Sequence, residues 1–387
     1  MNTNSCCNSE EAIKKNETSS ECVSNQNSCC CENAGMSTCE PVLQYDARQR
    51  WILGGIDTSE GKIPRISTKL SLSDIAGACK VRFGIGRMNY KINPGLYAAG
   101  MPDDTSPVLV TANYKLTFDA LRKELNDLNA WIVVLDTKGV NVWCSAGKGT
   151  FGTKELLNRI SKTRLSGIVS HKTLILPQLG APGVSAHEVE KKSGFRVVYG
   201  PVRAEDIKEF LEAGMKAKDE MRKVKFNIIN RAVLTPIEFI STFKIAILVF
   251  GIMFLVNLIA VNPFGVVDFY ALMGALIAGT VITPLLLPWI PVRAFAAKGW
   301  IMGLIWAMAV NILNGGFAIP EYGILKAFAY LLILPSVASY FAMNFTGSST
   351  YTSFSGVIRE MKIAVPLIGF TIGLGTVMLM INCFIHI

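Results

Sequence analysis

The sequence predicts a protein of two main parts, an α/β domain built on a mostly parallel sheet and a C-terminal bundle of about five transmembrane helices. Short β-rich runs alternate with helical runs between about 42 and 214, and this order is typical of a parallel sheet with helices on both faces. Half of the 387 residues are hydrophobic. The apolar residues gather in five stretches in the last part of the chain, each of roughly the length that crosses a bilayer.

The first part of the chain, residues 1–41, is polar and rich in cysteine. It has no apolar segment of the kind found in a cleavable signal peptide, so we expect the region before the spans to stay in the reducing cytoplasm, where cysteines are thiols or metal ligands. A segment with so few apolar residues is predicted to be disordered. Its thiolates could capture soft metal ions or hold an iron–sulfur cluster, or the tail could be incidental. These cysteines are Cys6, Cys7, Cys22, Cys29, Cys30, Cys31 and Cys39.

Within the α/β domain, residues 42–214, periodicity predicts strands at 107–111, 131–135, 174–176 and 196–199. The run 131–135 is apolar without alternation, as expected for a strand covered on both faces. Helices are predicted at 117–128, 153–162, 185–194 and 204–214, with Thr117, Thr153 and Ser185 as their N-terminal caps.

A lone cysteine, Cys144, lies in the loop that follows the strand 131–135. Ligands of open parallel sheets bind at the carboxyl ends of the strands, and Thr111, Asn113 and the segment 136–148 all fall at such ends. A thiol in this place is a candidate ligand or nucleophile. Nearby glycines, Gly147 among them, would let the backbone approach a bulky ligand closely.

The spans are predicted at 245–262, 269–290, 300–313, 327–345 and 363–385, of which the third is short. Basic residues precede the first span and lie in the loops after the second and fourth, which places the N-terminal domain in the cytoplasm. The basic linker 215–244 is expected to contact anionic lipid headgroups. This explains much of the net charge of +9 without any nucleic acid.

Three motifs together resemble one known family. They are the octet Asn141-Val142-Trp143-Cys144-Ser145-Ala146-Gly147-Lys148, the stretch Val-Thr-Ala-Asn-Tyr-Lys at 110–115 and the stretch Leu-Pro-Gln-Leu-Gly-Ala-Pro-Gly-Val at 176–184. The chain from about 82 to 214 looks like the corrinoid protein of bacterial and archaeal mercury methylation, and five spans agree with that family's architecture. The same domain is similar to the corrinoid-binding domain of the large subunit of the corrinoid iron–sulfur protein of the acetyl-CoA pathway.

The resemblance implies a Rossmann-like corrinoid-binding domain followed by a five-helix transmembrane domain, residues 245–387, in the inner membrane of an anaerobe. It implies a cobalamin-type corrinoid whose cobalt takes Cys144 as its lower axial ligand. The rest of the octet, Asn141, Val142, Trp143, Ser145, Ala146, Gly147 and Lys148, would form the helix that holds this cysteine, and Thr111 and Asn113 would contact the corrinoid. Two features depart from the family: Ser145 replaces the usual alanine, and the cysteine-rich extension is additional.

The implied activity is a corrinoid-dependent methyltransferase that passes a methyl group from methyl-Co(III) corrinoid to Hg(II). His171, His187 and His386 do not lie in an Asp-x-His-x-x-Gly motif, so histidine ligation through that motif is not expected. A Cys144 thiolate would donate strongly opposite the Co–CH3 bond. This favours departure of the methyl group as a carbanion or radical equivalent, which Hg(II) can accept.

The implied partners are a ferredoxin-like [4Fe–4S] protein as reductant and an upstream methyl donor, either a protein or methyl-folate. Two other functions stay open. One is a corrinoid methyl carrier of one-carbon metabolism in the acetyl-CoA pathway. The other is a membrane transporter with a cytoplasmic sensor domain, which charged or paired residues inside the spans would support. The sequence shows essentially none.

Overall fold

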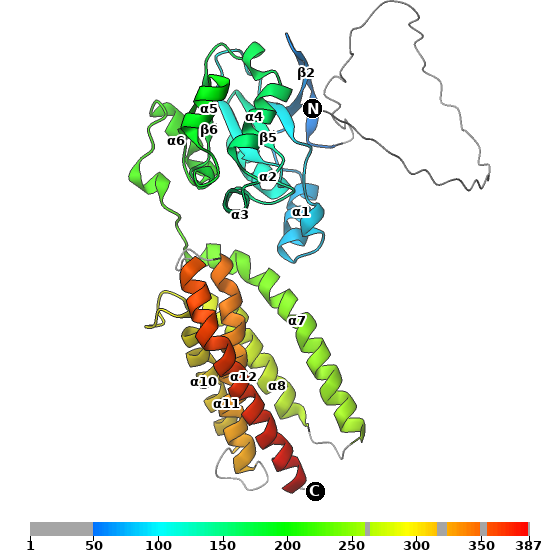
Figure 1. Ribbon diagram of the computed structural model, residues 1–387. Coiled ribbons are helices and arrows are strands. Elements are labelled where there is room, and N and C mark those ends of the chain that lie inside the picture. The colour runs from blue at the N-terminus through cyan, green and yellow to red at the C-terminus, as the bar shows by residue number, and fades with distance from the viewer. Residues whose placement is uncertain (1–48, 260–263, 316–322, 349–353, 386–387) are drawn as a thin grey trace, which may run out of the picture. The chain divides into compact units, whose positions relative to one another are not determined.

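The computed structural model describes residues 49–259, 264–315, 323–348 and 354–385 (Figure 1). The cysteine-rich segment 1–41 and its seven cysteines lie outside the described residues.

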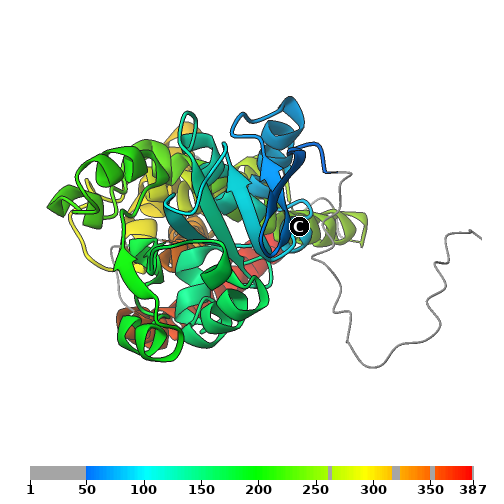
Figure 2. The ribbon, with the colours of Figure 1, turned by 90° about the horizontal axis from the view of Figure 1, so that it is seen from above.

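In the described part of the α/β domain, seven strands form one sheet with the order β1-β2-β3-β5-β4-β6-β7. The strands are β1 (Ile52–Thr58), β2 (Gly61–Ile66), β3 (Gly95–Ala99), β4 (Val108–Ala112), β5 (Ala130–Leu135), β6 (Thr173–Leu176) and β7 (Arg196–Tyr199). Figure 2 shows the blue β1–β2 hairpin at one edge of the sheet. The helices of this domain are α1 (Leu72–Arg82), α2 (Lys115–Glu124), α3 (Val142–Gly147), α4 (Thr153–Lys162), α5 (Ala186–Ser193) and α6 (Ile207–Glu212).

The predicted α/β class is confirmed, and the sheet is mixed rather than uniformly parallel. Strands β4, β5, β6 and β7 run parallel, whereas β3 pairs antiparallel with β5 and β1 pairs antiparallel with β2. The sequence analysis did not identify β1, β2 or β3. Glycine and alanine in β1 and β3 weaken the apolar pattern that marked the later strands.

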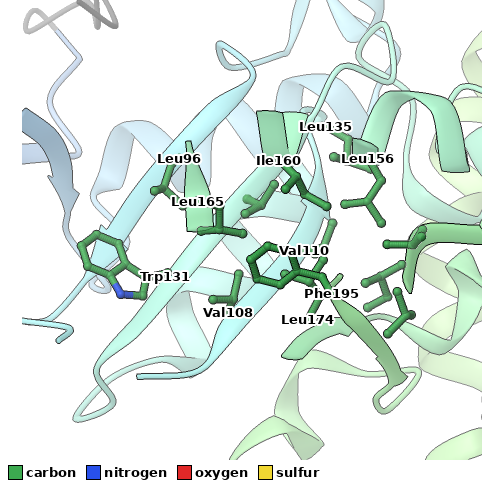
Figure 3. Packing of buried hydrophobic residues seen from close by; sticks show 14 of the residues in the cluster. Leu96, Val108, Val110, Trp131, Leu135, Leu156, Ile160, Leu165, Leu174 and Phe195 are labelled. Atoms are coloured by element: carbon green, nitrogen blue, oxygen red, sulfur yellow. The ribbon is translucent and has the colours of Figure 1, made fainter. Parts of the chain in front are cut away.

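Helices cover both faces of the sheet. On one face Val108, Val110 and Trp131 pack with Leu156 and Ile160 of α4, as Figure 3 shows. On the other face, residues of β4 and β5 pack with α2 and α6, including Phe118 and Phe210. Every residue of β4 and of β5 is buried, which confirms the prediction that a strand without alternation lies at the centre of the sheet.

Two of the three predicted caps are wrong. Helix α2 begins at Lys115 after Tyr114, and α4 begins after Gly152. Thr153 is the first residue of α4 rather than its N-cap, and its hydroxyl accepts a hydrogen bond from the Ser185 amide at 2.9 Å. The Ser185 cap is confirmed, because its side chain accepts from the Glu188 amide.

Five helical segments among the described residues are long and apolar enough to cross a membrane, as predicted. They are α7 (Ile228–Ile259), the continuous segment of α8 (Val266–Ile277), a π-helical turn (Ala278–Ile282) and α9 (Thr283–Leu286), then α10 (Phe295–Leu313), α11 (Ile324–Asn344) and α12 (Phe354–Ile385). Helix α7 begins well before the predicted span. Residues 228–244 of the predicted linker are therefore helical, and Arg231 among them is buried and donates to Phe226 O at 2.8 Å.

Small residues let the helices of the helical region pack closely, and an ion pair joins two of their ends. A Cβ at Gly303 would lie 2.6 Å from Pro335 Cα, and one at Gly279 would lie 2.5 Å from Ala338 O. Asp268, at the start of α8, pairs with Lys326 at 3.0 Å at the start of α11. This pair was not predicted from the sequence. Because both residues lie in the first turn of their helices, the pair joins two helix ends and does not by itself favour transport.

Candidate functional site at the carboxyl edge of the sheet

The candidate site lies at the edge of the sheet where the parallel strands end. Strand β4 ends at Ala112, β5 at Leu135 and β6 at Leu176. Since parallel neighbours end on the same side, the segments that follow them share one rim. Helix α3 begins seven residues after β5 and packs against the short turn Gln178–Gly180 that follows β6.

Helix α3 is held at its N-terminus by Asn141. The Asn141 side chain, in the N-cap position, accepts a hydrogen bond from the Cys144 amide at 2.9 Å. A capping amide satisfies a backbone donor that a helix of six residues could not otherwise pair. The cysteine is thus fixed at its backbone while its side chain is exposed.

The octet divides between two sides of α3. Val142, Ser145 and Ala146 are buried. Trp143, which is 40% exposed, lies on the open side with Cys144, Gly147 and Lys148. The octet therefore presents its cysteine outward on a short helix that is anchored by its inner side.

The Ser145 hydroxyl points into the helix itself. Its single proton lies within reach of two carbonyl oxygens, Asn141 O at 2.5 Å and Val142 O at 3.0 Å, and the side chain is fully buried. The hydroxyl that distinguishes this chain from the usual alanine is thus occupied by backbone carbonyls on the inner side of α3.

The stretch 176–184 forms the surface on which α3 rests. A Cβ at Gly183 would lie 2.1 Å from Phe151 O and 3.0 Å from Ala146 Cα, and one at Gly180 would lie 2.5 Å from the Phe151 ring. Gly183 is required because backbone packs directly on backbone there, and Gly180 leaves room for the Phe151 ring. Gly147 differs, since a Cβ there would meet no heavy atom within 4 Å, so the open side of α3 has room for a ligand.

A cavity of about 270 Å³ opens beside the first turn of α3. It is lined by the ends of β4 and β6, by α2 and by the segment after β7, and its lining is mostly apolar. Thr111, which is buried in β4, contributes to the wall together with Asn141, Val142 and Trp143. Four predicted site residues thus meet at one cavity.

Asn113 has a different environment from Thr111. Its side chain is 2% exposed and forms hydrogen bonds with the loop between β5 and α3. It does not line the cavity beside α3. The predicted contact of Asn113 with a ligand stays a prediction.

Two carboxylates border the same loop. Burial alone would raise the pKa of Asp136, but hydrogen bonds from the Lys138 side chain and amide outweigh it and lower that pKa. Burial would likewise raise the pKa of Glu155, but hydrogen bonds from the Asp136 amide and from Arg159 lower it. Both groups are therefore anionic at neutral pH and stabilise the loop.

Among the described residues, no group of three or more His, Cys, Asp or Glu side chains could hold a metal ion. The His171 ring lies 2.9 Å from Ser106 O, just before β6 begins.

Comparison with known proteins places this domain among relatives. Residues 85–211 match the family described as CO dehydrogenase/acetyl-CoA synthase delta subunit. The chain is 35% identical over 124 residues to the acetyl-CoA decarbonylase/synthase complex subunit gamma of Methanopyrus kandleri, which covers 32% of this chain and 26% of that protein. For the same subunit of Methanocaldococcus jannaschii the identity is 34% over 122 residues, which covers 31% of this chain and 25% of that subunit.

The chain matches only about a quarter of the length of these relatives. The family match ends at residue 211, before the first apolar helix, and includes Thr111, Asn113 and the whole octet. It agrees with the predicted similarity to a protein of the acetyl-CoA pathway. Residues 85–211, and with them the complete candidate site, are therefore similar to subunits of the acetyl-CoA decarbonylase/synthase complex.

Proposed function

We propose that the α/β domain binds a corrinoid at the carboxyl edge of its sheet and takes part in methyl transfer, with Cys144 as the lower axial ligand. The observation that carries this proposal is the exposed thiol of Cys144 on a capped helix, within a domain similar to acetyl-CoA decarbonylase/synthase subunits. A bound corrinoid would supply the cobalt on which the methyl group is carried.

The residues at this edge fit such a group. A corrinoid is broad and needs an open approach, and Gly147 and Gly149 have no heavy atom within 4 Å of an added Cβ. The apolar cavity beside α3 would receive part of a ligand larger than itself. Asn141 would hold the Cys144 backbone while the thiolate donates to the metal, and Thr111 would contact the ligand from the cavity wall.

We propose Hg(II) as the methyl acceptor. This proposal rests on the resemblance of the octet 141–148 and on the thiolate donor Cys144 within it. A bound corrinoid would supply the methyl group, and a Cys144 thiolate that donates to its cobalt would favour transfer of that group with its bonding electrons. Hg(II) could accept the methyl group in that form and would leave as CH3Hg⁺. The reductant would be a ferredoxin-like [4Fe–4S] protein, and the methyl donor an upstream protein or methyl-folate.

The second candidate is a methyl carrier of one-carbon metabolism, and the comparisons favour it. The similar proteins are named as subunits of an acetyl-CoA decarbonylase/synthase complex. The two candidates share the corrinoid site and differ in the acceptor.

We also propose that the helical region anchors the protein in the inner membrane with the α/β domain in the cytoplasm, because the basic residues flank the predicted cytoplasmic ends of the spans.

The test compares wild type with Cys144→Ala in the full chain, expressed in a corrinoid-supplied host. Cys79→Ala is the matched control, because Cys79 is the other exposed free thiol among the described residues. We expect Cys144→Ala to lose the thiolate-ligated cobalt spectrum and methyl transfer, and Cys79→Ala to keep both. Retention of both by Cys144→Ala would refute the proposal.

The acceptor is decided with the same wild-type protein. It is loaded with methyl groups and offered Hg(II) under reducing conditions. Formation of methylmercury in amounts stoichiometric with the methyl group supports the first candidate. A protein that accepts methyl groups from methyl-folate and a donor protein but yields no methylmercury supports the carrier.

A further inference from the structure

Asn113 is the most heavily bonded polar side chain near the candidate site. Its amide oxygen accepts from the Thr137 amide at 3.1 Å and from the Gly139 amide at 2.9 Å, and its amide nitrogen donates to Asp136 Oδ1 at 3.1 Å. The Thr137 hydroxyl lies 2.9 Å from the same oxygen. One buried side chain at the end of β4 thus contacts three residues of the loop that leads from β5 to α3.

The loop needs such support because of its backbone conformation. Lys138 has φ of 60° and Gly139 has φ of 75°, so two successive residues are in the left-handed region. A residue with a Cβ is strained there, and such a conformation persists only when its surroundings hold it. The bonds from Asn113 to Thr137 and Gly139 are placed on either side of the strained Lys138.

Further hydrogen bonds join Thr137 to Val140, which lies closer to Cys144 along the chain. The Thr137 hydroxyl lies 2.6 Å from Val140 O, and the Val140 amide donates to Thr137 O at 3.2 Å. Asn141 follows directly and accepts from the Cys144 amide. Hydrogen bonds therefore hold the chain from the end of β4 to Val140, and the next residue along the backbone, Asn141, bonds to the Cys144 amide.

The loop is held less extensively from its other side. Glu155 of α4 accepts from the Asp136 amide at 3.0 Å and pairs with Arg159 at 2.6 Å. This contact reaches only the first residue after β5. Within the loop, Asp136 accepts from the Lys138 amide at 3.1 Å. From the neighbouring strand β4, Asn113 bonds to the turn on both sides of Lys138.

We propose that Asn113 is a positioning residue for Cys144. Asn113 sets the place of the thiol by holding the turn 137–139 through hydrogen bonds, here called the clamp, rather than by contact with a ligand. This inference rests on the proposed function for its consequence, cobalt ligation. Ligand-orienting groups of this kind typically change metal affinity by about 10–100-fold when they are removed. The clamp itself is a property of the protein without a ligand, so it can be tested separately.

The first experiment measures hydrogen exchange in the full chain without corrinoid. The variants are Asn113→Ala and Thr137→Val, and Thr163→Val is the matched control, because Thr163 is a buried threonine whose hydroxyl donates to Arg159 O in α4. We expect the Gly139 and Cys144 amides to exchange at least about tenfold faster in both variants and to be unchanged in the control. Unchanged exchange at Cys144 in the variants would overturn the proposal.

Thr137→Val keeps Asn113 in place and carries the test if Asn113→Ala gives no folded protein. A rescue variant tests the hydrogen-bond pattern itself. In the double variant Asn113→Asp with Asp136→Asn the donor and the acceptor of the side-chain pair are exchanged, and an oxygen remains for the Thr137 and Gly139 amides. We expect Asn113→Asp alone to exchange faster, because two carboxylates then face each other. We expect the double variant to recover only in part, because the Asp136 Oδ1 that is replaced also accepts from the Lys138 amide. Wild-type exchange at Gly139 and Cys144 in Asn113→Asp, or a double variant that exchanges as fast as Asn113→Asp, would contradict the clamp.

The second experiment adds cob(II)alamin as the probe and records its affinity and the share of thiolate-ligated cobalt. We expect both to fall about 10–100-fold in Asn113→Ala, with no change in Thr163→Val. If the cobalt spectrum changes while hydrogen exchange at Cys144 does not, Asn113 contacts the ligand directly and the positioning role is wrong. If wild type binds no corrinoid, the proposed function fails, whereas the exchange measurements still decide the clamp.

Discussion

Glycines have opposite effects in the two parts of this molecule. At the carboxyl edge of the sheet, Gly147 and Gly149 border open space, where an added Cβ would meet nothing within 4 Å. In the helical region, a Cβ at Gly299 or Gly303 would lie within 2.5–2.6 Å of a neighbouring helix. The first pair leaves room for a ligand, and the second lets two apolar helices approach closely. The same residue type therefore indicates a site in one region and a packing contact in the other, and only the surroundings separate the two.

Buried charges differ in a similar way between the two regions. In the α/β domain, Asp74 and Asp119 both pair with Lys115 and with Arg122, which join α1 to α2. In the described helical region, an ion pair joins Asp268 of α8 to Lys326 of α11, and the Tyr330 hydroxyl donates to Asp268 at 2.5 Å. The buried Arg231 donates instead to Phe226 O, and the buried Lys298 donates to Leu287 O and Ile290 O. The α/β domain thus pairs buried charges with one another in a network, whereas the helical region satisfies two buried cations with backbone carbonyls.

The largest expected effect separates the two kinds of glycine. Gly303→Leu should destabilise the helical region by about 3 kcal/mol or more, because the new side chain would overlap the backbone of Pro335. Gly147→Leu should change the stability of the α/β domain by less than about 1 kcal/mol and yet abolish corrinoid binding. Hydrogen exchange resolved by region measures stability, and cobalt absorbance measures binding. Equal destabilisation by the two substitutions would show that the open side of α3 is closed by packing.

An intermediate effect on stability is expected from the buried ionic network of Asp74, Lys115, Asp119 and Arg122. Burial alone would raise the pKa of Asp74, but hydrogen bonds from Lys115 and Ser71 outweigh it and hold that pKa well below its usual range. A carboxyl whose folded pKa is lowered stabilises the fold above its unfolded pKa of about 3.9 and loses that contribution as pH falls below it.

The α/β domain should therefore lose stability as pH falls from about 4, and Asp74→Asn should flatten this dependence while it costs about 1.5–3 kcal/mol at neutral pH. Denaturant unfolding followed at several pH values checks both effects. An unchanged slope below pH 4 in Asp74→Asn would assign the acid sensitivity to other carboxyls. Asp136 and Glu155, whose pKa values are also lowered, would then be the next to replace.

The smallest expected effect is at Ser145. Its hydroxyl bonds only to carbonyls of its own helix turn, and alanine is the better helix former. Ser145→Ala should change stability by less than about 0.5 kcal/mol and leave the cobalt spectrum as in wild type. A shifted spectrum would mean that the serine reaches the axial ligand through the inner side of α3.

Much of the fold could be predicted because its elements are strongly patterned. Strands β4 to β7 and the existence of the five apolar helices were predicted, although α7 and α12 begin well before their predicted spans. The errors arose where tertiary contacts decide. Thr153 looked like a cap in sequence but binds the Ser185 amide, and β1 to β3 have too many small residues to produce a strand pattern.

The sequence by itself determined the α/β class, the five apolar helices and the octet around Cys144, because hydrophobic periodicity, span length and a local motif are all properties of neighbouring residues. Tertiary structure decided which distant residues meet. Asn113 does not line the cavity and bonds to a loop that follows a different strand, and Asp268 pairs with Lys326 across 58 positions of the chain. Such contacts join residues far apart in sequence, and they form only when the sheet and the helices are packed.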